Sequence, residues 1–193
     1  MAHQAPRAAT YADVLAAPDH LVAEVIDGEL SLLPRPRKPH AAAATALGEE
    51  LGPPFKRGRG GPGGWFLLFE PEVHLGADIL VPDLAGWRRE RMPQLVDDDP
   101  YFTLAPDWVC EVLSRSTAVL DRTRKLPIYA RERVGHVWFV DPIVRTLEVL
   151  KLGADGWLLL GTWAGDARVR AEPFDAIELE LGILWQGVEL TEP

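Results

Sequence analysis

Two acidic residues lie inside apolar stretches that have the length and β-branched content of buried strands. Asp83 lies within Ile79 to Ala85, and Glu111 lies within Trp108 to Leu113. A buried carboxylate without a partner costs roughly several kcal/mol, or its pKa shifts until it is neutral. A divalent cation held between the two carboxylates would offset that cost. Structural salt bridges to arginine explain the two acids equally well from the residues alone.

The length and composition are those of one folded domain, expected to span residues 1–193, since the chain has 193 residues of which 47% are hydrophobic. Its longest apolar runs are far shorter than the roughly 20 residues needed to cross a bilayer, and its first residues lack a signal-peptide core. We therefore expect a cytoplasmic protein without a membrane segment. The single cysteine, Cys110, excludes an internal disulfide and a thiolate zinc cluster.

The charge limits the partners and the metal. A net charge of −9 argues against a strongly basic nucleic-acid binder, so any contact with DNA is expected to be local. The five histidines show neither HxH nor HExxH spacing, which disfavours a histidine zinc site. A site built from oxygen ligands would select Mg²⁺ or Mn²⁺ instead.

The first half of the chain is predicted to alternate helices and strands. Thr10 and Asp13 form a capping-box pattern for a short helix, and Asp27-Gly28 suits the turn of a hairpin that contains Glu24. A helix is expected from His40 to Leu51. The following segment, 52–64, is rich in glycine and is not expected to be regular structure; it is either a solvated connection or a basic loop that touches phosphate. Two strands, 65–75 and 78–87, are expected next, with Asp83 inside the second.

The second half begins with a surface excursion over 88–106 and a strand over 107–113. A capping-rich turn then leads into a helix ending near Arg133, and Pro127 is expected to kink or break this helix. Asp121, Lys125 and Tyr129 share one face if the helix stays regular, whereas a kink at Pro127 would rotate Tyr129 away. A strand over 134–141 and several short strands follow, so the C-terminal third is predicted to be mainly antiparallel β.

The order of these motifs resembles the Uma-type family, whose members are described as "putative restriction endonucleases" of the PD-(D/E)xK nuclease superfamily. The resemblance spans roughly Thr10 to Trp185 and is most specific between Pro106 and Tyr129. The residues that carry it are Glu24-Val25-Ile26-Asp27-Gly28-Glu29, His40, Pro82-Asp83, Pro106 to Ser114, Thr117, Asp121, Lys125, Tyr129 and Trp138 to Pro142.

The resemblance implies an α/β (α+β) fold with a restriction-endonuclease-like mixed β-sheet flanked by helices. It implies a Mg²⁺ (or Mn²⁺) site at Asp83 and Glu111, with the carbonyl of Val112 as a further ligand. The superfamily's strand lysine is replaced by Leu113. Lys125 is then the third catalytic residue and reaches the site from a helix, as is typical of Uma-type relatives.

Five further residues are assigned supporting roles: Glu24, His40, Ser114, Asp121 and Tyr129. For some of them a structural role is also open. Glu24 could be a strand residue that faces solvent, and His40 could be a helix cap rather than a phosphate contact. Asp121 and Lys125 have the spacing of an ordinary ion pair on an exposed helix face.

The leading hypothesis is a metal-dependent endonuclease that hydrolyses DNA, in which Lys125 positions the attacking water. A homodimer is expected if both strands are cut. The alternative, motivated by the acidic charge and by Leu113, is an inactive nuclease-fold module for binding or interaction. Hydrolysis of RNA or of a small phosphodiester is a third hypothesis.

Overall fold

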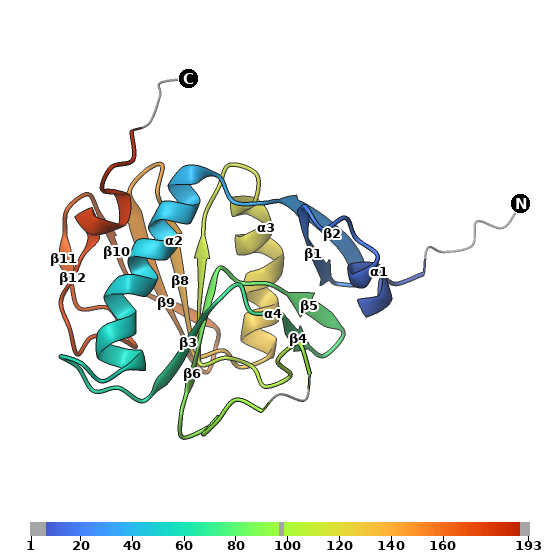
Figure 1. The fold of residues 1–193 in the computed structure, drawn as a ribbon, viewed down its shortest axis with the longest axis horizontal. Helices are drawn as coiled ribbons and strands as arrows, with labels where there is room; N and C mark the ends of the chain where they lie inside the picture. The colour runs from blue at the N-terminus through green and yellow to red at the C-terminus, as the bar shows by residue number, and fades with distance from the viewer. Residues whose placement is uncertain (1–6, 97–98, 190–193) are drawn as a thin grey trace, which may run out of the picture.

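The computed structural model describes residues 7–96 and 99–189, so that Asp97 and Asp98 of the expected surface excursion lie outside the described residues. Its centre is a six-stranded sheet (Figure 1). The strands lie in the order β10 (Trp157–Ala164), β9 (Thr146–Leu152), β8 (His136–Asp141), β7 (Trp108–Val112), β6 (Leu84–Arg88) and β3 (Trp65–Phe69). β7 and β8 run parallel and the other neighbours antiparallel, which confirms the predicted mixed sheet.

A smaller sheet lies beside it. Its four antiparallel strands lie in the order β2 (Glu29–Pro34), β1 (Leu21–Ile26), β5 (Asp78–Leu80) and β4 (Val73–Leu75). The predicted hairpin is confirmed, since Asp27 and Gly28 have φ angles of 52° and 77° between β1 and β2. The predicted capping box is also confirmed at α1 (Tyr11–Leu15), where Asp13 accepts the Thr10 N–H at 2.8 Å.

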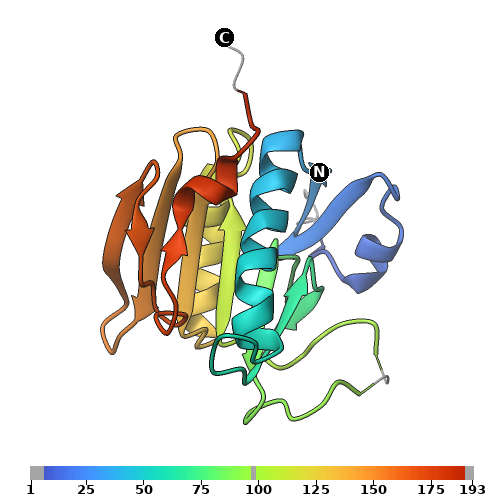
Figure 2. The same ribbon diagram turned by 60° about the vertical axis from the view of Figure 1, so that its left-hand side comes forward.

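Helices cover both faces of the larger sheet (Figures 1 and 2). α2 (Lys38–Leu51) lies on one face, and α3 (Ala118–Leu120), η2 (Asp121–Lys125) and α4 (Leu126–Arg131) lie on the other. Trp108, Cys110 and Val112 of β7 pack into the core under α2, whereas Val109 and Leu113 pack into the core under α4. Because strand side chains alternate between faces, Glu111 lies on the α4 side. Within the described residues no helix has the length and hydropathy to cross a bilayer.

Two expected strands are each divided into two. Residues 65–75 contain β3 and β4, and residues 78–87 contain β5 and most of β6. The break between β5 and β6 transfers the chain from the smaller sheet to the larger one. Pro82 favours a break there because it has no N–H to donate to a sheet. The prediction that Asp83 lies within a strand is therefore wrong, since it lies in this connection.

The glycine-rich segment is partly regular, contrary to the prediction. Gly52–Lys56 form a π-helical turn, η1, that continues α2. Pro53 and Pro54 are accepted there because they occupy the beginning of the turn. Residues 57–64 follow as an irregular connection in which several glycines have positive φ angles.

The helix that carries Lys125 is widened rather than broken. α3, η2 and α4 follow one another directly, and the N–H of Leu126 donates to the carbonyl of Asp121 across a π-helical turn. Pro127, which has no N–H, is the second residue after this turn. In place of the expected kink or break near Pro127, the helix has a π-helical turn.

The C-terminal third is mainly antiparallel β, as predicted. Besides β8, β9 and β10 it contains the short pair β11 (Arg168–Val169) and β12 (Leu179–Glu180). A 3₁₀ helix that was not predicted, η3 (Leu181–Trp185), follows β12 and packs beside α2 in the core.

Close packing around β6 makes Gly86 a sensitive position. A Cβ atom there would lie 2.9 Å from Leu67 Cδ2 and 3.2 Å from ring atoms of Trp108 and Trp65. We expect Gly86→Ala to lower the free energy of unfolding by about 1–3 kcal/mol through overpacking. Gly153→Ala is the matched control, because its Cβ would meet only the Gly156 carbonyl oxygen, at 3.4 Å. Urea unfolding measures both, and equal stability of the two variants would contradict this packing.

Candidate active site

Four carboxylates and one ammonium group meet at one cavity of about 690 Å³. They come from Glu24 of β1, Asp83 of the β5–β6 connection, Glu111 of β7, and Asp121 and Lys125 of η2. The structure thus brings together residues that are far apart in the chain, including the two acids and the lysine singled out in the sequence.

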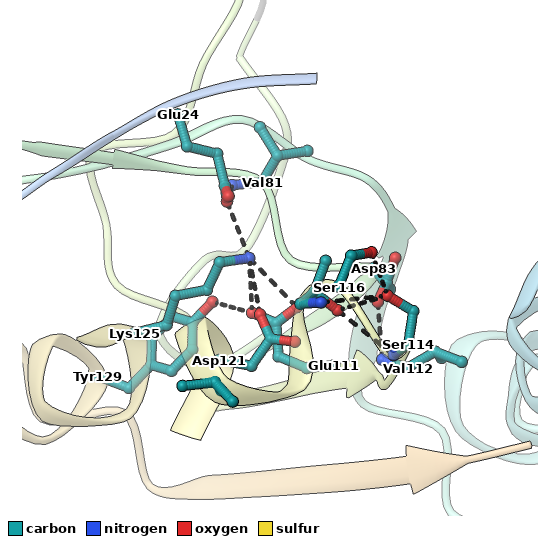
Figure 3. A network of polar contacts seen from close by, with 12 residues as sticks. Glu24, Val81, Asp83, Glu111, Val112, Ser114, Ser116, Asp121, Lys125 and Tyr129 are labelled. Carbon is teal, nitrogen blue, oxygen red and sulfur yellow. Dashed lines mark hydrogen bonds and ion pairs between the residues drawn. The ribbon is translucent and has the colours of Figure 1, made fainter. Parts of the chain in front are cut away.

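The Lys125 ammonium lies between three of these carboxylates (Figure 3). Its Nζ is 2.9 Å from Glu24 Oε1, 3.3 Å from Glu111 Oε1 and 3.5 Å from Asp121 Oδ1. Only 4% of the Lys125 side chain is exposed, and the three acids are buried. Asp121 and Lys125 are therefore not a pair on an exposed helix face.

Tyr129 holds the Glu111 carboxylate from the helix side. Its hydroxyl donates to Glu111 Oε1 at 2.5 Å, and the tyrosine itself is fully buried. Of the two alternatives for Tyr129, the structure therefore shows the one in which it stays on the same side as Lys125. The wide turn of η2 leaves both side chains on the same carboxylate.

Asp83 lies on the other side of Glu111 (Figure 3). The Val112 N–H donates to its Oδ2 at 2.7 Å, and His40 Nε2 lies 2.6 Å from its Oδ1. Its side chain is 16% exposed, so that it is the more accessible of the two predicted metal ligands. Within residues 7–96 and 99–189, neither Asp83 nor Glu111 pairs with an arginine.

His40 is not the helix cap that was considered. α2 begins at Lys38 with Arg37 as its N-cap, because Pro39 is tolerated in the first turn, where N–H groups have no helical partner. His40 is in that first turn and orients Asp83. Its contact with a phosphate stays a prediction.

Glu24 points inward from the hairpin and does not face solvent. It is 0% exposed, and its Oε1 accepts the Val81 N–H at 2.8 Å. Its Oε2 has no hydrogen-bond partner among the described residues. A buried carboxylate oxygen without a donor is unfavourable.

Arg124 fastens the hairpin to the helix. It donates to the Ile26 carbonyl at 2.8 Å, to Glu29 Oε2 at 2.7 Å and to Asp27 Oδ2 at 3.2 Å. It is adjacent to Lys125, so these bonds also set the distance between Glu24 and the ammonium. Sequence analysis missed this residue because only the fold places it beside the hairpin turn.

Burial and mutual repulsion shift the pKa values in the site. Burial raises the pKa of Glu111 well above its ordinary value, and repulsion by Asp121, Asp83 and Glu24 adds to this against the attraction of Lys125. Burial likewise raises the pKa of Asp121. Burial acts to lower the pKa of Lys125, but its attraction to Glu111, Glu24 and Asp121 prevails and raises it. Lys125 therefore stays charged, within an excess of carboxylates.

This excess of carboxylates fits a divalent cation. The cavity lining has six carboxylates against one ammonium, three guanidinium groups and the His40 imidazole. Lys125 is the only one of these cations paired with the buried carboxylates, and Glu24 Oε2 lacks a donor among the described residues. In the part of the chain that the structure describes, no three His, Cys, Asp or Glu side chains are close enough to bind an ion by themselves. Zinc sites are built from such sets of protein ligands, whereas Mg²⁺ keeps several waters and needs one or two carboxylates.

Asp83 and Glu111 are the carboxylates that fit such an ion best, since Asp83 accepts the N–H of Val112, the residue next to Glu111 in β7. The Val112 carbonyl is a third candidate ligand. The N–H and C=O groups of one strand residue point to the same neighbour, and the Val112 N–H is bonded to Asp83.

The segment that follows β7 adds hydroxyl groups to the cavity. Ser114 Oγ lies 3.0 Å from Ser116 Oγ and 3.0 Å from Thr117 Oγ1, and all three residues line the cavity. These bonds hold the loop in place, and the supporting role of Ser114 in the site stays a prediction.

Sequence analysis also missed three arginines. Arg35, Arg37 and Arg115 line the same cavity and are exposed. The Pro-Arg-Pro-Arg spacing of residues 34–37 was a signal of an extended segment. Nothing in that spacing indicates that the segment lies beside the acids.

The model of the Uma2 family, described as "Putative restriction endonuclease", matches residues 9–183. The chain belongs to the Uma2 family. This Uma2 protein also has the fold of a solved "putative nuclease belonging to DUF820" from Anabaena variabilis ATCC 29413. The two share 21% sequence identity with a TM-score of 0.74, over 92% of this chain and 97% of that chain. No match was found among curated proteins. The sequence-based family resemblance and fold class are confirmed.

The buried ammonium of this Uma2 protein is predicted to be essential for stability. Lys125→Met would leave the carboxylates of Glu24, Glu111 and Asp121 without their shared partner, at a cost of about 3–5 kcal/mol. Lys151→Met is the control, because Lys151 is 46% exposed and its pair with Glu172 contributes about 1 kcal/mol or less. Urea unfolding in EDTA compares the two, and equal losses would contradict the buried network.

Proposed function

We propose that this Uma2 protein is a Mg²⁺- or Mn²⁺-dependent endonuclease that hydrolyses phosphodiester bonds in DNA. The observation that best supports the proposal is that Asp83, Glu111 and Lys125 line one cavity. The family description and the similar fold indicate the nuclease class. The cavity adds the two carboxylates and the ammonium group that metal-dependent phosphodiester hydrolysis requires.

Asp83 and Glu111, with the Val112 carbonyl, would hold the cation. The chemistry supplied by the bound cation is neutralisation of charge on the scissile phosphate and acidification of a water molecule. The other residues keep these ligands in place, since preorganised donors stabilise a developing charge without reorganising during the reaction. His40 holds Asp83, and Tyr129 holds Glu111.

Lys125 would orient the attacking water. An ammonium has three N–H donors. Lys125 Nζ donates to Glu111 and forms ion pairs with Glu24 and Asp121 within 3.5 Å. If Glu111 held a cation with its carboxylate, the Lys125 donor that it now accepts would be available to a water or a phosphate oxygen. Leu113 occupies the position of the superfamily's strand lysine, and Lys125 takes over the role of that lysine from the helix.

The proposal names DNA because the family description is that of restriction endonucleases. RNA and small phosphodiesters are competing substrates for the same chemistry. One cavity cuts one strand at a time, so cleavage of both strands of a duplex would call for a homodimer.

Metal binding tests the two acids directly. We expect isothermal titration calorimetry with MgCl₂ to give binding heat for the wild type and loss of that heat in Asp83→Asn and in Glu111→Gln, because each removes a charged ligand. Glu172→Gln is the matched control, since Glu172 pairs with Lys151 outside the cavity and should leave the heat unchanged. Indistinguishable heats in all four proteins would refute the metal site.

Cleavage tests the activity. With Mg²⁺ we expect the wild type and Glu172→Gln to cleave DNA, EDTA to stop the reaction, and Asp83→Asn or Glu111→Gln to slow it by about 100-fold or more. Gel electrophoresis of plasmid, linear and single-stranded DNA, with RNA alongside, identifies the substrate. Metal binding without cleavage of any of these would favour the inactive binding module instead.

A further inference from the structure

We propose that the DNA enters this cavity as an unpaired single strand, and that Arg37 and Arg115 bind phosphates on the two sides of the scissile one. The inference rests on the proposed function and deepens it by specifying the form of the substrate. It follows from the positions of the two arginines, the depth of the acids and the charge of the whole protein.

The two arginines are placed as a pair of phosphate contacts. Arg37 caps α2 in the connection from β2, and Arg115 lies in the loop between β7 and α3. These two connections lie at the same end of the larger sheet (Figure 1). Both arginines line the cavity and are exposed, and within the described residues no hydrogen bond or ion pair engages either guanidinium. Arg35, by contrast, is already engaged with Glu70 and with the Asp19 carbonyl.

The low exposure of the site residues favours a single strand over an intact duplex. The side chains of Glu111 and Lys125 are 3% and 4% exposed, and even Asp83 reaches only 16%. A cavity of about 690 Å³ has the size that holds a drug-sized ligand, on the order of two nucleotides. In a duplex, pairing and stacking hold each nucleotide in place, so that extruding one into a cavity costs unpairing and unstacking energy. A single strand can bend into the cavity without that cost.

The net charge of the protein also favours a single strand over a duplex. Duplex DNA carries one charge per about 1.7 Å of its length, twice the density of one strand. A chain with a net charge of −9 repels such a surface, and two free arginines can offset only a few phosphates. Leu33 and Ile143 are half-buried and add apolar surface to the cavity, which unpaired bases can contact.

Fluorescence anisotropy tests the inference separately from cleavage. The probe is a labelled deoxyoligonucleotide of about twelve nucleotides, free or annealed to its complement, with Glu111→Gln as the cleavage-deficient background and the wild type in EDTA as a second arm. We expect the single strand to bind about tenfold or more tightly than the duplex. Arg37→Gln and Arg115→Gln should each weaken single-strand binding about fivefold and reduce the slope of log K against log salt by about 0.7.

Arg170→Gln is the matched control, because it removes the same charge from an exposed arginine outside the cavity and should bind as its background does. An RNA oligonucleotide of the same sequence is a further probe. Duplex binding as tight as single-strand binding, tighter binding of this RNA, or Arg37 and Arg115 variants that behave as Arg170→Gln would each overturn the inference. Arginine-dependent binding by a protein that never cleaves DNA would instead refute the proposed hydrolysis and leave this inference standing. Cleavage of duplex DNA at a rate that neither arginine substitution changes would support the proposed hydrolysis and overturn this inference.

Discussion

The buried ammonium of Lys125 joins the three parts of the protein that form the cavity. It contacts Glu24 of the hairpin, Glu111 of the central sheet and Asp121 of its own helix. None of these charges would be tolerated alone at this depth, since an uncompensated buried ion costs roughly several kcal/mol. Each group therefore depends on the others, and the hairpin, the sheet and the helix are held in one arrangement by the residues that the proposed chemistry uses.

The position of Lys125 on a helix has a packing reason. Leu113 lies two residues after Glu111 and so faces the same side of the sheet, where it is 2% exposed in a cluster with Ile128 and Tyr129. A lysine at that position would have to fit its ammonium beneath α4. The helix that covers this face can instead bring an ammonium down to Glu111 from above. The π-helical turn of η2 accommodates Pro127 while Lys125 and Tyr129 both reach the same carboxylate.

The sequence predicts those features that depend on neighbouring residues. The capping box at Thr10, the hairpin turn at Asp27-Gly28 and the buried strand around Glu111 are set by local backbone and side-chain preferences. The inward position of Glu24 and the bond between His40 and Asp83 are not local. His40 and Asp83 are 43 residues apart, and no periodicity or spacing relates them.

The strand wrongly predicted at Asp83 and the three arginines that were missed both depend on contacts between distant parts of the chain. Apolar residues on both sides of Asp83 favoured a continuous strand, but the chain changes sheets at Pro82, and this change depends on where the neighbouring strands lie. The arginines at 35, 37 and 115 looked like ordinary surface residues, because only the fold brings their segments to the acids. The family resemblance supplied the pairing of Asp83 with Glu111 that the residues alone left open.

Charge in the cavity is separated by depth, and this has a consequence for the order of binding. The exposed charges of the lining are three arginines and two glutamates, Glu70 and Glu189, which together are net positive, whereas the carboxylates of Glu24, Glu111 and Asp121 are buried. A phosphate is attracted by the first group and repelled by the second, unless a cation offsets the carboxylates. In the proposed function, the affinities for cation and for DNA are therefore coupled, and each ligand must raise the affinity for the other by the same factor.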